Sequence, residues 1–182
     1  EIVGGRIDKI RGERKAITTV NDLRGNDPAK HKTNIPTYEV VTLGEVYEGI
    51  ELKLKAYGNN VEKLFYVKPG TDPGVIRLKL SGAKALRVNE EGQLEAETAL
   101  GTVRFTKPRV YQESKVPSPA KKENISSASV TGNGSGEGTL RDGQDIEAAY
   151  VVTGNEYGFQ LGDYDRTQGV VIDPLLASTF LG

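Results

Sequence analysis

The chain has 182 residues, of which 36% are hydrophobic and 27% charged, and its 24 basic and 25 acidic side chains give a formal net charge of −1. This composition is typical of a globular chain, and the charge balance argues against a nucleic-acid-binding surface, which needs a net basic face. Cysteine is absent, which excludes disulfides, cysteine zinc sites and thiol nucleophiles, and no apolar run is long enough for a transmembrane helix.

The first third of the chain predicts strands separated by polar turns. Residues 1–20 carry scattered isoleucines and valines among glycines and charges, which predicts one or two marginal strands that need a partner sheet. Arg24–Asn34 is a polar turn, in which Asp27-Pro28 favours the start of one helical turn. We expect a strand over Thr37–Leu43 and a connection over Gly44–Gly49.

The central third has the clearest strand pattern. Apolar and charged residues alternate over Glu51–Tyr57, and a period of two places the apolar side chains on one face of a strand. Gly58-Asn59-Asn60 then predicts a hairpin turn into Val61–Lys68, because glycine and asparagine tolerate positive φ. A turn rich in proline and glycine precedes a further alternating strand, Val75–Ser81.

Shorter strands follow at intervals of about ten residues, a spacing typical of a sandwich or barrel. They are expected around Ala85–Val88, Gln93–Glu97, Thr102–Phe105 and Arg109–Gln112. Strand patterning returns at Ile146–Thr153 and Tyr157–Leu161, which flank the turn Gly154-Asn155.

These elements predict an all-β fold, an antiparallel β-sandwich or two packed β lobes, with Greek-key or meander connections and little helix. We divide it into an N-terminal strand segment that a partner could exchange (1–23), a main β domain (24–112), a flexible insertion rich in serine and glycine (113–145), and C-terminal strands that complete the domain (146–182).

Five ordered motifs resemble a known family. They are GNDPAKHKTNIPTY (25–38), VYEGIELKLKAYGN (46–59), FYVKPGTDPGVIRLKLSGA (65–83), KPRVYQE (107–113) and VVIDPLLASTFLG (170–182). Together they are similar to the uncharacterised β-rich domain that precedes the β-propeller repeats of bacterial SBBP-repeat proteins. The resemblance covers most of residues 24–182 and implies a β-rich fold and a secreted or surface location, with no established catalytic residues.

Two features depart from that family pattern. The connection between Tyr111 and Tyr150 is longer here than the usual short hairpin, and it is rich in glycine and serine. The sequence also stops at Gly182, where the family pattern would begin its propeller repeats.

The sequence offers weak candidates for catalysis. His31, the only histidine, lies between Lys30 and Lys32, and a general base or metal ligand would need carboxylates nearby. The 25 acidic residues are enough for a glycosidase site built on two carboxylates. Most of them alternate with lysine or arginine along the strands, however, and a solvated sheet surface is the simpler interpretation.

Several aspartates suggest turns or a calcium site. Asp27, Asp72 and Asp173 each precede proline, where a short carboxylate can accept backbone N–H bonds in an Asx turn. Calcium binding is the alternative. Asp163 and Asp165 are its best candidates, although no loop with EF-hand spacing accompanies them. We expect no other cofactor.

Other polar positions have structural and functional interpretations. Tyrosines recur about once per strand, which favours packing over a sugar-stacking site. Asn124 and Asn133 fit the N-x-S/T glycosylation pattern, which matters only in a cell that glycosylates.

The prediction for function is a non-catalytic, extracellular structural module that self-associates through its strand edges, as in a pilus-like filament. Residues near both ends look like strands without a hairpin partner, and an exposed strand edge accepts a strand supplied by a neighbour. The predicted assembly residues are Ile2, Val3, Ile7, Ile10, Leu175, Leu176, Phe180 and Leu181.

Two other functions remain open: a carbohydrate-binding or cell-surface adhesion module, and a glycosidase-like hydrolase. The expected partners are further copies of this chain, and cell-surface glycans in the adhesion case, with neither nucleic acid nor membrane insertion. A secreted or cell-surface location also suits a chain with no cysteine or methionine to oxidise.

Overall fold

The computed structural model describes residues 1–57, 60–113, 143–174 and 176–177. Its strands form three sheets, and every strand pairing is antiparallel. The largest has the order β1 (Arg11–Asp22), β2 (Lys32–Tyr47), β3 (Ile50–Tyr57), β4 (Asn60–Val67), β13 (Val170–Asp173), β9 (Arg109–Glu113) and β10 (Gly143–Ile146). The all-β antiparallel prediction is confirmed.

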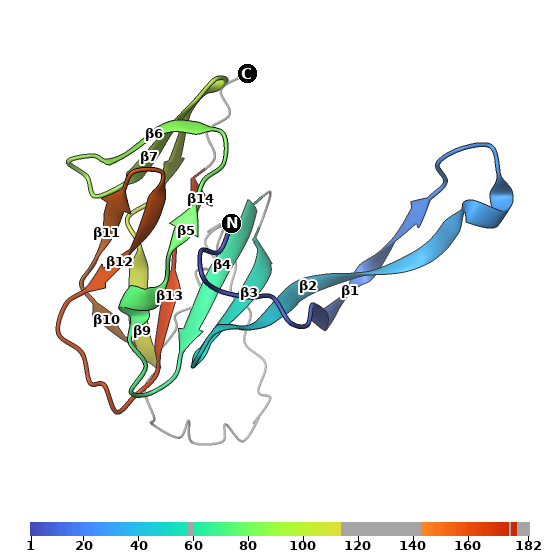
Figure 1. Ribbon diagram of the computed structural model, residues 1–182. Helices are drawn as coiled ribbons and strands as arrows, with labels where there is room; N and C mark the ends of the chain where they lie inside the picture. Colours follow the sequence, from blue (N-terminus) through green and yellow to red (C-terminus); the bar gives the residue numbers. More distant parts are fainter. Residues whose placement is uncertain (58–59, 114–142, 175, 178–182) are drawn as a thin grey trace, which may run out of the picture.

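Two smaller sheets cover one face of the large sheet (Figure 1). One is four-stranded, with the order β14 (Leu176–Ala177), β8 (Gly101–Phe105), β7 (Leu94–Thr98) and β6 (Ala83–Val88). The other is three-stranded, with the order β11 (Ala148–Thr153), β12 (Glu156–Leu161) and β5 (Leu78–Lys79). In the described ranges, helical structure is limited to two 3₁₀ turns, η1 (Pro28–Lys30) and η2 (Pro73–Val75).

The main hydrophobic core lies between the three sheets, and a second, smaller cluster of Leu64, Tyr111 and Val171 is separate from it. An aromatic group forms the centre of the main core, because Phe65 of β4 lies 5.9 Å from Phe159 of β12, and Tyr150 of β11 packs edge-on at 5.9 Å from Tyr157. Such tilted and edge-to-face pairs stabilise a core beyond the area that they bury. The alternating residues of β3 contribute as expected, since Ile50 and Leu52 are both buried.

The strand predicted over Val75–Ser81 is wrong in extent. Asp72 accepts a hydrogen bond from the Gly74 N–H and begins η2, so the chain turns through Val75 and pairs with β12 only at Leu78 and Lys79. The predicted alternation still holds, because Ile76 and Leu78 both enter the core.

The N-terminal segment has partners within its own chain, which corrects the expectation that it lacks one. β1 pairs with β2, and Ile2 forms a bridge with Leu78 at the open edge of β5. The predicted boundary between residues 23 and 24 therefore falls inside a hairpin.

The C-terminal part fits the predictions in the residues that are described. β11 and β12 form the expected hairpin across Gly154-Asn155, and β13 inserts between β4 and β9. β10 begins at Gly143, so its first three residues lie inside the predicted insertion. Most of that insertion lies outside the described residues, as do Leu175, Phe180 and Leu181.

Candidate functional site

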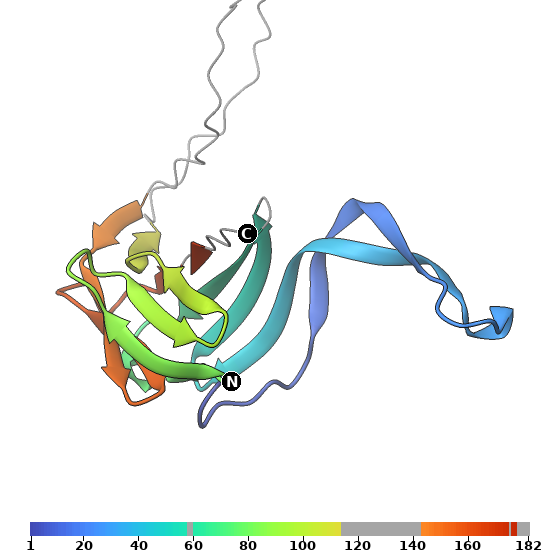
Figure 2. The ribbon, with the colours of Figure 1, turned by 90° about the horizontal axis from the view of Figure 1, so that it is seen from above.

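A two-stranded arm projects from the body of the domain (Figures 1 and 2). We define the arm as residues 11–39, which comprise β1, the turn with η1, and the distal half of β2. β3 pairs with β2 only from Val40 to Tyr47, so the part of β2 before Val40 has β1 as its sole strand partner. Two-stranded ribbons are marginally stable in water, so an arm of this length is a candidate for contact with a partner.

The arm and the chain leading into it carry much of the apolar surface of the domain. Six of the eleven large hydrophobic residues that are exposed in the described ranges fall between residues 7 and 38. They are Ile7, Ile10, Ile17, Val20, Leu23 and Tyr38, and Ile17 is fully exposed. Clustered apolar exposure of this kind marks an interaction surface more often than scattered exposure does.

Local sequence explains why this segment forms strands without a core. Ile17, Thr18, Thr19 and Val20 are all β-branched, a type that favours extended backbone. The Thr37 hydroxyl donates to the Thr18 carbonyl at 2.6 Å, and the Asn34 N–H donates to the Asn21 side chain at 2.9 Å. Side-chain bonds therefore supplement the ladder.

Ion pairs hold the base and the tip of the arm. At the base, Lys53 of β3 lies 2.9 Å from Glu13 of β1, and both side chains are largely shielded. At the tip, Arg24 binds Asp22 at 2.8 Å and holds the pKa of that carboxyl below its ordinary value. Charge is concentrated at both ends of β1, and its middle is uncharged.

The arm also differs from the body in charge. Residues 11–39 hold six basic and four acidic side chains, against 24 and 25 in the whole chain, which leaves 18 basic and 21 acidic side chains elsewhere. The arm is therefore net basic and the rest of the chain net acidic.

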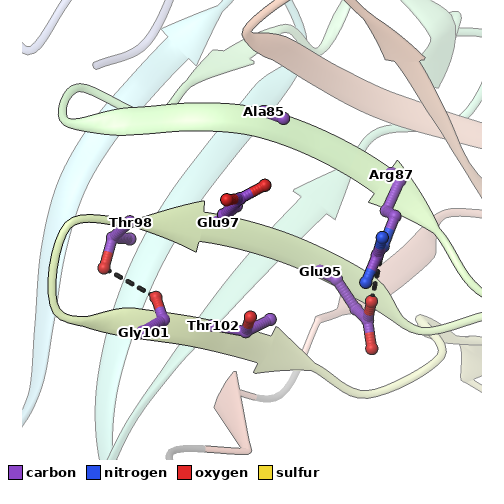
Figure 3. Close-up of a pocket in the computed structure, with 7 residues that line it drawn as sticks. All are labelled: Ala85, Arg87, Glu95, Glu97, Thr98, Gly101 and Thr102. Carbon is purple, nitrogen blue, oxygen red and sulfur yellow. Dashed lines mark hydrogen bonds and ion pairs between the residues drawn. The ribbon is translucent and has the colours of Figure 1, made fainter.

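A second candidate site is a hollow of about 410 Å³ on the outer face of β6, β7 and β8 (Figure 3). Glu95 lies at one end, 2.9 Å from Arg104 and 2.7 Å from Arg87. These hydrogen bonds, that from Arg104 first, lower the pKa of Glu95 to about 2, so its carboxylate stays ionised near neutral pH.

The rest of the hollow is small and polar. Glu97 follows on the same face of β7, and the Thr98 hydroxyl donates to the Gly101 carbonyl at 2.7 Å (Figure 3). The lining residues include no aromatic ring on which a sugar could stack. Glu95, which two arginines keep ionised, is poorly suited to act as a general acid.

Histidine and the calcium candidates have local partners. His31 lies at the tip of the arm with its Nε2 3.0 Å from the Gly25 carbonyl. Asp165 accepts hydrogen bonds from the Thr167 N–H and hydroxyl and from the Gln168 amide. Asp163 is exposed. In the part of the chain that the structure describes, no three histidine, cysteine or acidic side chains gather as metal ligands would.

Two of the three predicted Asx turns are confirmed. Asp27 accepts from the Ala29 N–H and Asp72 from the Gly74 N–H, and each begins a 3₁₀ turn. Asp173 ends β13 opposite Arg109 of β9, and its Asx turn remains a prediction because Leu175 lies outside the described residues. Asn124 and Asn133 lie outside the described residues, so their glycosylation remains a prediction.

Tyrosines pack as predicted where their side chains are described. Tyr111, Tyr150 and Tyr157 are buried, and the Tyr150 hydroxyl donates to the Thr106 carbonyl at 2.8 Å. Only Tyr38, on the arm, is exposed among the described tyrosines.

Of the predicted assembly residues, Ile2 and Val3 lie against the edge of β5, and the Val3 N–H donates to the Arg77 carbonyl at 2.9 Å. Ile7 and Ile10 lie exposed beside the arm, and Leu176 lies in β14. The arm itself was missed, and the signal that could have located it is the uncharged β-branched run at Ile17–Val20.

The sequence matches the model of one family, a domain of unknown function (DUF7948), over residues 2–129. The chain belongs to this family. The match spans well over half of the chain and includes the whole arm and the hollow. A position before β-propeller repeats remains a prediction.

No curated protein and no solved structure matches the chain. The described residues include no helix that is long and apolar enough to cross a membrane.

Proposed function

We propose that this DUF7948 domain is a non-catalytic structural module that self-associates through its strand edges outside the cell. The observation that carries the proposal is the arm, which exposes apolar side chains and an unpaired strand edge away from the core. A filament subunit is the form of assembly that we favour, because strand edges at opposite ends of one sheet allow contacts to propagate.

Two features support an assembly role. The exposed hydrophobic residues concentrate in residues 7–38, and the arm contributes no residue to the buried core. A segment that costs backbone entropy to order and buries no apolar side chain inside its own domain is best explained by a partner.

The test is removal of the arm. A variant that replaces Lys15–Glu39 by Asn-Gly closes the hairpin at the Arg14–Val40 pair and leaves every core residue in place. We expect the intact chain to form oligomers or fibres that grow with concentration, by light scattering and negative-stain microscopy, and the shortened chain to remain monomeric. An intact chain that is monomeric at millimolar concentration would refute the proposal.

Adhesion to surface carbohydrate is the second candidate, and the hollow on β6–β8 favours it. Glu97 and Thr102 could accept and donate hydrogen bonds to sugar hydroxyls. A glycan array would test this role, with the Glu97→Ala variant as the matched control. Binding that the variant does not change would place any glycan site elsewhere.

A further inference from the structure

We infer that the arm contact is a two-fold pairing of β1 with β1 of a second copy, antiparallel and centred on Thr18. This inference rests on the proposed function and specifies its interface. It assigns Ala16–Asn21, which the sequence did not single out, as the pairing segment.

The outer edge of β1 suits an added strand along this segment only. The first part of the edge carries four charged residues, which disfavour the addition of another strand: Arg11, Glu13, Arg14 and Lys15. The six residues from Ala16 to Asn21 are uncharged and free of proline and glycine, and the four from Ile17 to Val20 are β-branched. High β-propensity and low charge are the properties of segments that pair between chains.

The ladder inside the arm is interrupted at the same place. The pairs Lys15–Tyr38 and Thr19–Pro36 are four residues apart on β1 but two apart on β2, so Ala16, Ile17 and Thr18 have no register partner in β2. Pro36 also brings no N–H to the ladder. A strand on the other side of β1 would add backbone pairing where β1 has no register partner in β2.

Symmetry limits the register. A two-fold axis perpendicular to a sheet keeps each side chain on its own face. The axis must therefore lie between one residue and the same residue of the second copy, which then face each other. With Thr18 at the axis, and with the irregularities of β1 between Arg14 and Asp22 straightened on pairing, Ile17 faces Thr19, Ala16 faces Val20, and Arg14 faces Asp22 of the other copy.

Charge selects this register among its neighbours. Centring on Thr18 brings Arg14 against Asp22 twice and brings no like charges together, so each of the two would share or exchange its partner within the chain, Glu39 at 3.9 Å from Arg14 and Arg24 at 2.8 Å from Asp22. Centring on Thr19 would oppose Arg14 to Arg24, centring on Val20 would oppose Glu13 to Asp27, and centring on Ile17 would leave every charge without an opposite partner.

A two-fold contact closes on itself and makes a dimer. A filament therefore requires a second contact, for which the far edge of the large sheet, β10, is available in the order of strands. The arm pairing accounts for the first step of the proposed assembly.

The first test is disulfide cross-linking, which is simple to interpret because the chain contains no cysteine. Paired residues at the axis place their Cα atoms about 4.5–5.5 Å apart, within reach of a disulfide. We expect Thr18→Cys to give a covalent dimer under mild oxidation. Thr19→Cys, which lies off the axis on β1, and Thr33→Cys, which lies on β2, should cross-link far less.

The second test exchanges charge. Arg14→Asp and Asp22→Arg should each weaken dimerisation about tenfold or more in sedimentation equilibrium, since each places like charges together at two symmetric positions. The double variant R14D/D22R should restore the dimer. Circular dichroism and the thermal midpoint check that each variant folds.

The possible results separate this inference from the proposed function. If the chain self-associates but Thr33→Cys cross-links as well as Thr18→Cys, or the double variant fails to recover, the register is wrong and self-association stands. If the chain stays monomeric, and no variant cross-links, both are wrong.

Discussion

At the scale of single residues, Glu95 shows how the outer face of β7 is stabilised. Arg104 and Arg87 both bind its carboxylate, and they lower its pKa from an ordinary 4.5 to about 2. A carboxyl whose pKa is lower in the folded state stabilises the fold at pH values above its unfolded pKa. This stabilisation is lost as the pH falls from about 4.5 to about 2.

We therefore predict that Glu95→Gln makes stability less sensitive to acid. Glutamine takes up no proton on unfolding, so urea midpoints of the variant should fall less steeply than those of the parent between pH 4.5 and 2. Glu97→Gln, on the same face without a hydrogen-bonded arginine among the described residues, is the control. Parallel curves for parent and Glu95→Gln would contradict the assignment.

Tyr47 anchors the N-terminal residues to the edge of β5. Its hydroxyl lies 2.9 Å from the Arg77 carbonyl and 3.1 Å from the Val3 carbonyl, and it accepts a bond from the Arg77 N–H at 3.1 Å. Burial raises the pKa of this hydroxyl, which keeps it protonated as a donor.

Tyr47→Phe should loosen this junction at a cost of about 1 kcal/mol, the usual loss for one hydrogen-bonding group. The amide of Lys79, which donates to the Glu1 carbonyl at 2.9 Å, should then exchange with solvent faster. Tyr38→Phe, on the exposed arm, should leave that exchange unchanged. If the Lys79 amide exchanged at the same rate in Tyr47→Phe and in the parent, the backbone bonds around Ile2 would be enough to hold the N-terminal residues on β5 without the Tyr47 hydroxyl.

At the scale of elements, β12 depends on a glycine. A Cβ at Gly158 would lie 2.6 Å from the Ile76 carbonyl oxygen, so only glycine allows the chain after η2 to pass this close to β12. Backbone at that distance cannot move aside without disturbing the core residue Ile76.

Gly158→Ala should lower the free energy of unfolding by about 1–3 kcal/mol, the range for overpacked interiors. Chemical denaturation measures it. Gly162→Ala, where the nearest contact would be 3.3 Å, should cost less. A loss no greater at Gly158 than at Gly162 would contradict the close approach.

The elements also show how far the sequence alone reaches. Alternation identified the buried face of β3, and glycine and asparagine located the β3–β4 and β11–β12 hairpins. Asp27 located the first 3₁₀ turn, and the Asx turn predicted at Asp72 begins the second. These features depend only on residues that are close in the sequence, so the sequence alone can predict them.

Strand partners could not be predicted in the same way. Alternation predicts which face of a strand is buried but not which strand lies beside it. The insertion of β13 between β4 and β9 therefore could not be predicted. The arm was missed for a further reason. Apolar residues usually indicate burial, and Ile17 and Val20 are exposed.

At the scale of the whole molecule, the domain combines a closed core with an open edge. The core is held by three sheets and an aromatic centre, so it does not need the arm. The arm has hydrogen bonds and ion pairs but no buried apolar side chain beyond its base, so it gains most from a partner. The proposed assembly role requires this division, a stable domain whose arm is left for contact with other copies.

The most direct test of the central claim is amide hydrogen exchange of the arm as a function of protein concentration. If copies associate through β1, the amides of Ala16–Asn21 will become protected as concentration rises, while those of the core strands will not change. Exchange at Ala16–Asn21 that stays fast and independent of concentration would contradict it.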